Sequence, residues 1–177
     1  GEEADFHIEL LLVVDIGIIG LPNAGKSSLL NTLTSAQSKV GDFPFTTLEP
    51  SLGDFYGLIM ADIPGLIEGA AKGKGLGHKF LRHIERTKTL AHCISSEIEN
   101  PLEAHRVVRK ELELYNKNMK KKPEVIILTK VDTLTEKEKK NKLRLLKSVN
   151  PKVFPVSILD DELIKEFGKY LTKTFKS

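Results

Sequence analysis

The stretch GLPNAGKSS, residues 20–28, combines residue types that hold phosphate groups. It matches the pattern GxxxxGK(S/T) and lies between a strand-like run, DIGIIG, and a helix-like run, SSLLNTL, the context that this pattern requires. In such a loop, backbone amides surround the phosphates, Lys26 neutralises the outer ones, and the Ser27 hydroxyl can ligate Mg²⁺. The alternative, a glycine-rich turn without a ligand, is disfavoured by this context. The stretch therefore predicts a nucleoside triphosphate site formed by Gly20, Leu21, Pro22, Asn23, Ala24, Gly25, Lys26, Ser27 and Ser28.

Two short motifs further along the chain fit the same chemistry. DIPG closes an apolar run, which places Asp62 where it can hold a Mg²⁺-bound water and Gly65 where its amide can contact the terminal phosphate. FTT precedes that run, and a threonine there can ligate Mg²⁺ only while the terminal phosphate is bound. Each motif alone carries little information, but their order along the chain makes them one set. The residues are Phe45, Thr46, Thr47, Asp62, Ile63, Pro64 and Gly65.

The motif TKVD, residues 129–132, indicates which base the site would hold. It follows the apolar run EVIILT, so its side chains are expected at the end of a strand. Asp132 could accept hydrogen bonds from the ring NH and the exocyclic amine of guanine, a donor pair that adenine lacks. Together with the phosphate loop, Thr129, Lys130 and Asp132 favour GTP over ATP.

The elements that must position these residues alternate between strand and helix from about residue 8 to the end. Such alternation predicts an α/β fold, a doubly wound and mostly parallel sheet with helices on both faces. The predicted strands cover residues 8–19, 55–63, 90–94, 124–129 and 152–157. The predicted helices cover residues 26–36, 77–88, 101–118, 135–148 and 160–175, and the third begins with the cap signal Asn100-Pro101.

Composition narrows the class of protein. A chain of 177 residues with 40% hydrophobic content is the size of one domain, and its single cysteine, Cys93, is expected in the core and excludes a disulfide within the chain. No apolar run approaches the roughly 18 residues that a membrane span needs, and the start of the chain is acidic, so a cytoplasmic protein without membrane contact is expected. The lysine clusters at 117–122 and 137–142 are interpreted as solvated helix ends rather than as an RNA surface.

Three longer stretches, GLPNAGKSSLLN, FPFTTLEPSLG and ADIPGLIEGAAKGKGLGHKFLRHIERT, resemble the G domain of the Obg family of translational GTPases. The resemblance covers nearly the whole chain and implies a Ras-like fold, GTP and Mg²⁺ as ligands, slow hydrolysis to GDP, and a switch role in large ribosomal subunit assembly. It also links the family to the stringent-response nucleotides (p)ppGpp as ligands. We expect a monomer in a bacterial cytoplasm, with an organelle as the alternative. Residues 1–177 are expected to form a single G domain, without the glycine-rich domain that precedes it or the domain that follows it in the family, so ribosome contacts would use regions partly missing here.

The same resemblance assigns roles to individual residues. Ser27 and Thr47 would ligate Mg²⁺ directly, and Asp62 would hold it through water. Phe45 to Glu49 would form the first switch, and the second would begin at Asp62. Lys26, Thr47 and Gly65 would act in hydrolysis, with Asn23 as a candidate K⁺ ligand that substitutes for an arginine finger. The final guanine-contacting loop would consist of Ser157, Ile158 and Leu159.

Several positions depart from the family pattern. Thr129 stands where most relatives carry asparagine, so we expect it mainly to support the phosphate loop, with weaker but still guanine-selective binding. Ile158 is bulkier than the usual alanine or serine. The link between FTTLEPSLG and MADIPG is shorter than in typical members and leaves only DFYG, residues 54–57, to turn a hairpin, so its edge strand is expected to be truncated.

Leu66 follows Gly65 where Ras-type enzymes carry the glutamine that orients water, which predicts slow hydrolysis. Two alternatives therefore stay open: a nucleotide-sensing module with negligible turnover, and an Obg-like ATPase with relaxed base selectivity, against which the retained Asp132 argues. Of the histidines, His78 and His83 are interpreted as part of a polar helix face, and His92 as a satisfied strand residue rather than a ligand.

Overall fold

The computed structural model describes residues 13–35, 51–63 and 85–176, and these form a six-stranded sheet in the order β2-β3-β1-β4-β5-β6. All neighbouring strands are parallel except β2 and β3, which form an antiparallel hairpin. The strands are β1 (Ile16–Ile19), β2 (Ser51–Phe55), β3 (Leu58–Asp62), β4 (Thr89–Ser95), β5 (Glu124–Thr129) and β6 (Val153–Pro155). The helices are α1 (Lys26–Ser35), α3 (Pro101–Tyr115), α4 (Glu136–Lys147) and α5 (Asp161–Phe175), with short 3₁₀ helices η2 (Lys117–Lys121) and η3 (Val131–Thr133).

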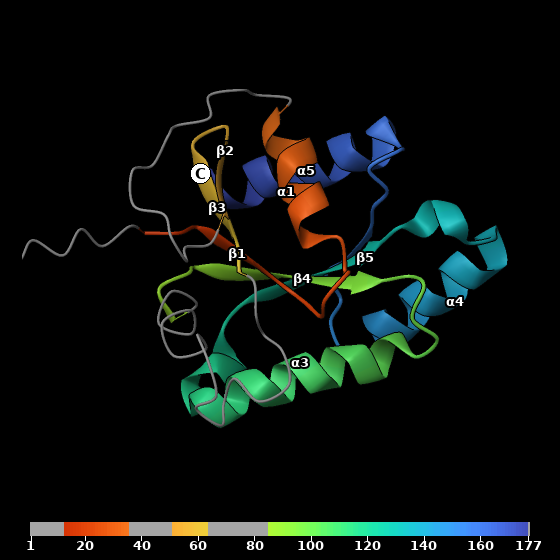
Figure 1. Ribbon diagram of the computed structural model, residues 1–177, viewed down its shortest axis with the longest axis horizontal. Coiled ribbons are helices and arrows are strands. Elements are labelled where there is room, and N and C mark those ends of the chain that lie inside the picture. The colour runs from red at the N-terminus through yellow and green to blue at the C-terminus, as the bar shows by residue number, and fades with distance from the viewer. Residues whose placement is uncertain (1–12, 36–50, 64–84, 177) are drawn as a thin grey trace, which may run out of the picture.

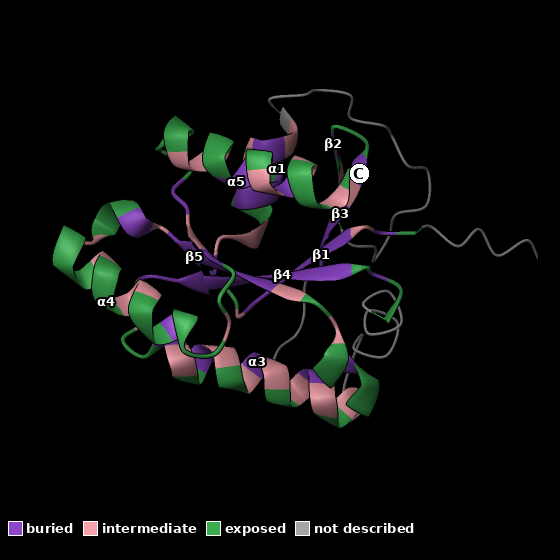
Figure 2. Cartoon of the chain, turned by 180° about the vertical axis from the view of Figure 1, so that it is seen from behind, coloured by how far each residue is buried: buried purple, intermediate pink, exposed green. Residues whose placement is uncertain are grey.

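Helices cover both faces of the sheet (Figure 1). Leu29, Leu30 and Leu33 of α1 pack with Phe167 and Leu171 of α5 on one face, and α3 and α4 pack on the other. Figure 2 shows the strands buried between these layers, with the exposed positions on the outer sides of the helices. β4 is buried along its whole length, as expected for a central parallel strand covered on both faces. The predicted doubly wound α/β fold is therefore confirmed.

Local signals account for where the helices begin. The Asn100 side chain accepts a hydrogen bond from the Glu103 amide and Pro101 occupies the first turn of α3, as predicted. Thr135 and Glu138 form a capping box at the start of α4. No helix in the described part of the chain is long and apolar enough to cross a membrane.

The main differences from the predicted elements lie at boundaries. The predicted strand 55–63 is divided by a turn at Tyr56 and Gly57, whose φ angles are 51° and 88°, because the Gly57 amide donates to Asp54 Oδ1 at 2.7 Å and stabilises the turn. β2 pairs with β3 over five residue pairs, and the residues before β2 lie outside the described part of the chain, so the predicted truncation of the edge strand stays a prediction.

Three other predicted boundaries also shift. The first predicted strand, 8–19, is reduced in its described part to β1. α3 ends at Tyr115 rather than at residue 118, because Asn116 adopts an extended conformation and caps both α3 and η2. Of the predicted helix 77–88, residues 77–84 lie outside the described residues, Glu85 is helical, and residues 86–88 are not.

Candidate functional site

The carboxyl ends of several parallel strands bring the described motif residues to one edge of the sheet. β1 leads into the phosphate loop, β3 ends at Asp62, β5 ends at Thr129, and the chain after β6 carries Ser157. Ligands of open α/β sheets bind at this edge. The predicted residues Phe45, Thr46, Thr47, Pro64 and Gly65 lie outside the described residues, and their roles stay predictions.

The phosphate loop, residues 20–25, is shaped by three residues with positive φ. These angles are 151° at Gly20, 63° at Asn23 and 82° at Gly25. α1 begins directly after the loop, so its free amides and positive dipole end face the concave side. The Lys26 ammonium donates to the carbonyl oxygens of Gly20 at 3.2 Å and Leu21 at 3.1 Å, which holds a positive charge within the loop. The arrangement suits a chain of phosphates.

Ser27 and Asp62 meet beside this loop. β3 pairs with β1 in a register that sets Asp62 opposite Ile18, and the Ser27 hydroxyl donates to Asp62 Oδ2. Asp62 is buried, and its Oδ1 has no hydrogen-bond partner among the described residues. A hydroxyl and an unpartnered carboxylate oxygen are the oxygen donors that Mg²⁺ prefers. The residues present therefore fit Mg²⁺, with Ser27 and Asp62 as the groups that would hold it.

A pocket of about 270 Å³ adjoins the phosphate loop on the other side. Asp132 lies in its wall, and the Ser157 hydroxyl donates to Asp132 Oδ1 at 2.5 Å, which fixes the direction of this carboxylate. Ile158 and Leu159, 48% and 78% exposed, add an apolar wall that could cover a planar base. The pocket thus offers an oriented carboxylate and apolar surface next to the phosphate loop, in the arrangement that a purine nucleotide needs.

Thr129 connects the phosphate loop to the pocket that contains Asp132. It is buried, and its hydroxyl donates to the Ala24 carbonyl oxygen of the phosphate loop at 2.7 Å and is 3.3 Å from that of Ile94. The side chain therefore supports the loop from β5, the contact that we expected of this residue despite its departure from asparagine.

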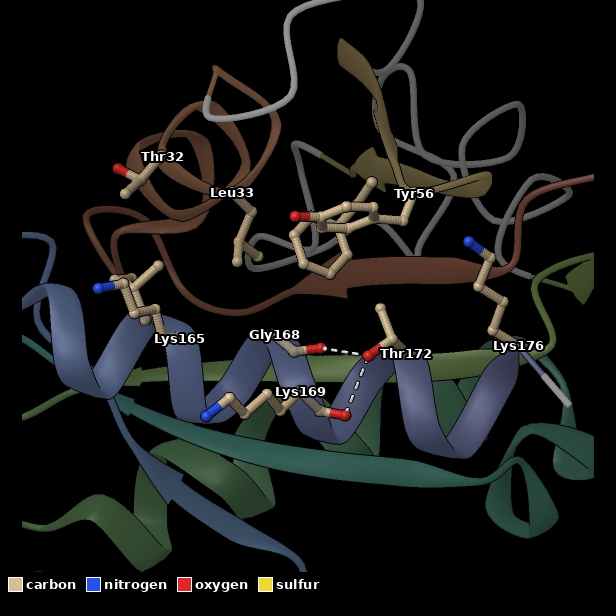
Figure 3. Close-up of a pocket in the computed structure, with 10 residues that line it drawn as sticks. Thr32, Leu33, Tyr56, Lys165, Gly168, Lys169, Thr172 and Lys176 are labelled. Atoms are coloured by element: carbon tan, nitrogen blue, oxygen red, sulfur yellow. Dashed lines mark hydrogen bonds between the residues drawn. The ribbon is translucent and has the colours of Figure 1, made fainter.

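A larger cavity, of about 460 Å³, lies on a different surface and contains none of the predicted site residues. It is formed by α1, α5 and the β2–β3 turn, with Leu33 and Tyr56 facing Gly168 across it (Figure 3). Because no residue of the phosphate loop lines it, we assign it no part in nucleotide binding.

The sequence profile of the 50S ribosome-binding GTPases matches residues 15–130, about two thirds of the chain. The chain belongs to the 50S ribosome-binding GTPase family. Its curated relatives confirm the resemblance to Obg proteins: GTPase Obg of Anaplasma phagocytophilum is 50% identical over 92% of this chain and 47% of its own length. GTPase Obg of Persephonella marina is 46% identical over 99% of this chain and 54% of its own length. The chain thus spans about half the length of the curated relatives that it matches.

Solved structures similar to this member of the family share its fold at low sequence identity. SelB from Methanococcus maripaludis in complex with the GTP analogue GPPNHP gives a TM-score of 0.64 at 16% identity over 97% of this chain and 35% of that one. A variant of Era from Aquifex aeolicus bound to GDP·AlF₄⁻ gives a TM-score of 0.61 at 24% identity, covering 88% of this chain and 56% of the Era chain. The G domain of the T. maritima FeoB iron transporter gives a TM-score of 0.57 at 22% identity, covering 87% of this chain and 98% of the FeoB chain.

The structure of this family member adds Glu97, a pocket residue that sequence reasoning missed, and shows how the predicted Lys130 is held beside it. Lys130 has a φ angle of 59°, and its ammonium donates to Glu97 at 2.7 Å in the wall of the base pocket. This hydrogen bond lowers the pKa of the exposed Glu97 carboxyl. The Ser96 hydroxyl donates to the Lys130 carbonyl oxygen at 2.7 Å. The polar run SSE after the buried strand β4 was the available signal, since it lies at the same edge of the sheet.

Replacing Thr129 with valine is expected to lower the free energy of unfolding by about 1–3 kcal/mol, because the Ala24 carbonyl oxygen loses a buried donor at nearly constant side-chain volume. Nucleotide affinity should fall as well, since the loop loses its support from β5. Urea unfolding and nucleotide titration measure the two effects. Thr172→Val is the control, because among the residues that the structure describes the Thr172 hydroxyl bonds only within α5, to the carbonyl oxygens of Gly168 and Lys169. Equal effects of the two substitutions would contradict a role of Thr129 in supporting the phosphate loop.

Replacing Gly20 with alanine is expected to destabilise the protein by at least about 3 kcal/mol. The added Cβ would overlap the Cys93 carbonyl oxygen, and the φ of 151° is unfavourable for alanine. Gly57→Ala separates the two causes, because Gly57 has a φ of 88° but no atom within 4 Å of an added Cβ. It should cost only about 1–2 kcal/mol in a urea titration. An equally mild Gly20→Ala would mean that the loop and β4 move apart easily.

Proposed function

We propose that this chain binds GTP with Mg²⁺ and hydrolyses it slowly to GDP and phosphate. The observation that carries the proposal is the oriented Asp132 carboxylate in the pocket next to the phosphate loop. Asp132 can pair with the ring NH and the exocyclic amine of guanine, whereas adenine lacks that donor pair. The GTPase names of the family and of the curated relatives support the same conclusion.

In this proposal the described residues divide the work of binding. Lys26 and the loop amides neutralise the phosphates, while Ser27 and Asp62 hold Mg²⁺, which would supply positive charge at the transferred phosphate. Thr47 and Gly65 are proposed to complete the site around the terminal phosphate, and Phe45 and Thr46 to belong to the first switch. Thr129 supports the loop, and Ile158 and Leu159 cover the base.

Slow turnover is proposed because Leu66 cannot orient water as the glutamine of Ras-type enzymes does. Asn23, exposed in the phosphate loop with a φ of 63°, is proposed as a K⁺ ligand that lets this ion stabilise the developing charge. Hydrolysis should then be faster in potassium chloride than in sodium chloride. Equal rates in the two salts would remove Asn23 from the mechanism and leave GTP binding unaffected.

The biological role that we propose is a nucleotide-dependent switch in assembly of the large ribosomal subunit, in a bacterial cytoplasm and as a monomer. The family description, 50S ribosome-binding GTPase, supports the ribosomal partner. The regions that relatives carry beyond the matched half would contribute to that contact. The stringent-response nucleotides (p)ppGpp, which also carry guanine and a diphosphate, would compete for the same site.

The first experiment is a titration with fluorescent GDP in Mg²⁺, followed by competition with GTP and with ATP. Displacement by GTP alone supports the proposal, and displacement by both nucleotides would favour an ATPase or a general nucleotide sensor. Single-turnover hydrolysis of bound GTP then separates a slow enzyme from a binding module. The observation that favours the module is Leu66, and failure to release any phosphate would establish it.

A further inference from the structure

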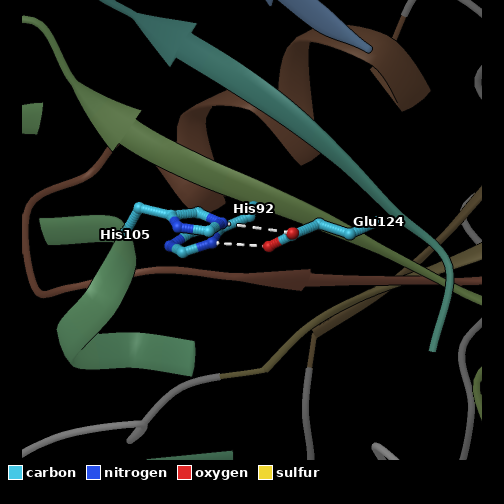
Figure 4. Close-up of side chains that lie close together, drawn as sticks. All are labelled: His92, His105 and Glu124. Atoms are coloured by element: carbon cyan, nitrogen blue, oxygen red, sulfur yellow. Dashed lines mark hydrogen bonds and ion pairs between the residues drawn. The ribbon is translucent and has the colours of Figure 1, made fainter. Parts of the chain in front are cut away.

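A second cluster of potential ligands lies on the α3 side of the sheet. His92 from β4, His105 from α3 and Glu124 from the start of β5 converge there (Figure 4). His92 Nδ1 lies 2.8 Å from Glu124 Oε1, and His105 Nε2 lies 3.2 Å from Glu124 Oε2. The two imidazole rings are stacked with centroids 5.1 Å apart. One ligand atom from each residue lies within 4.8 Å of the others.

The three side chains of this cluster are largely buried. The side chains of His92, Glu124 and His105 are 1%, 9% and 12% exposed. Burial lowers the pKa of His92, against the opposing effect of Glu124, and so favours the neutral imidazole. Burial alone would raise the pKa of Glu124, but hydrogen bonds from His105 and His92 outweigh it and hold the pKa well below its usual range.

His92 is also not fully satisfied, contrary to the sequence-based interpretation. Its Nδ1 bonds to Glu124, but its Nε2 is buried and has no hydrogen-bond partner among the described residues. Sequence reasoning could not see the cluster, because residues 92, 105 and 124 are brought together only by the pairing of β4 with β5 and by the packing of α3.

We propose that His92, His105 and Glu124 form a binding site for a divalent transition metal, with Zn²⁺ as the best match. Two imidazoles and one carboxylate are donors that Zn²⁺ accepts, and three protein ligands leave a fourth position open. His105 and Glu124 line a surface cavity of about 620 Å³, so that open position would face solvent. A Zn²⁺ ion would replace the two His–Glu hydrogen bonds, and donor atoms within 4.8 Å of one another are near enough for one ion to contact all three after side-chain adjustment.

Positively charged side chains near the cluster affect its affinity for a metal ion. The Arg109 guanidinium donates to the carbonyl oxygens of Met119 at 3.2 Å and Lys120 at 2.9 Å, and its charge contributes to the lowered pKa of His92. The positive charge of Arg109 repels a bound cation, and the negative charge of the Glu124 carboxylate offsets that repulsion. The cavity also contains Arg106, Lys110 and Lys122. These cations favour an anion or water as the fourth ligand of the metal.

The proposed metal site is separate from the nucleotide site. Glu124 is the first residue of β5, whereas Thr129 and Asp132 lie at the other end of that strand and beyond it. No residue is shared between the cluster and the phosphate loop or base pocket. The inference therefore does not depend on the proposed GTPase activity, and its test can be made with the nucleotide site filled.

The test is a titration of the full chain, saturated with GDP and Mg²⁺, with Co²⁺ followed by displacement with Zn²⁺. Four-coordinate Co²⁺, as expected at this cluster, absorbs visible light much more strongly than six-coordinate, oxygen-bound Co²⁺ at a Mg²⁺ site. We expect saturable absorption and a Zn²⁺-dependent rise in melting temperature. His105→Ala and Glu124→Gln should each weaken Zn²⁺ binding by about 100-fold or more, because loss of even an outer-shell partner costs about 10–100-fold.

Glu166→Gln is the matched control for Glu124→Gln, since it removes an exposed carboxylate from α5, on the opposite face of the sheet from α3, and should leave Zn²⁺ affinity unchanged. A cooperative thermal unfolding transition verifies that each variant is folded. Glu124→Gln preserves side-chain shape and serves as the test if His105→Ala does not fold. Absence of saturable Co²⁺ absorption in the unmodified chain would overturn the proposal. So would equal Zn²⁺ affinity in the unmodified chain and either folded variant.

Discussion

Asp132→Asn is expected to weaken GDP and GTP binding by roughly 10²–10⁴-fold, since each hydrogen bond to a charged group contributes about 1.5–3 kcal/mol and two are altered. The asparagine oxygen can still accept from the ring NH, but its amide donor would face the exocyclic amine of guanine, which is also a donor. Xanthine carries a carbonyl oxygen in place of that amine. The variant should therefore prefer xanthosine diphosphate, and competition against fluorescent GDP and its xanthosine analogue measures the change.

Ser157→Ala is the companion variant, because it leaves the carboxylate in place and removes only the hydroxyl that orients it at 2.5 Å. We expect it to weaken GDP binding by about 1 kcal/mol without transferring preference to xanthine. If Asp132→Asn binds GDP as tightly as the unmodified chain, Asp132 does not contact the base. The pocket beside it would then serve another ligand.

The phosphate loop could be predicted from sequence because its geometry is local. Gly20, Gly25 and Lys26 lie within seven consecutive residues, and the flanking apolar runs form β1 and α1 as expected. A hairpin could be expected at DFYG, but the predicted strand 55–63 runs through its turn, because Phe55 and Leu58 continue an apolar pattern across a turn that depends on one hydrogen bond from Gly57 to Asp54. A pattern of hydrophobicity does not report such a bond.

Contacts between distant segments set the limit of sequence reasoning. Asp132 could be placed at a strand end, but the donation from Ser157 and the position of Glu97 follow from the alignment of β4, β5 and the chain after β6. The same alignment brings His92 near Glu124. Each of these pairs is separated by more than twenty residues, and neither partner carries a signal that names the other.

Lys26→Met is expected to have the second large effect, a loss of about 3 kcal/mol or roughly 100-fold in GTP affinity, because charge-assisted hydrogen bonds to phosphate are among the strongest available. Methionine keeps much of the length and apolar volume of the stem, so the variant removes mainly the charge that now bonds the Gly20 and Leu21 carbonyl oxygens. The fold should survive, since Lys26 is only partly buried and lies in the first turn of α1.

The matched control is Lys152→Met, which removes an equal charge from an exposed position before β6, away from the phosphate loop. Comparing GTP, GDP and guanosine by competition then locates the effect. A lysine that contacts the outer phosphates should matter most for GTP, less for GDP and little for guanosine, because the partners of its ammonium disappear in that order. A uniform loss for all three ligands would instead mean that Lys26 acts by holding the loop in shape through its two carbonyl contacts.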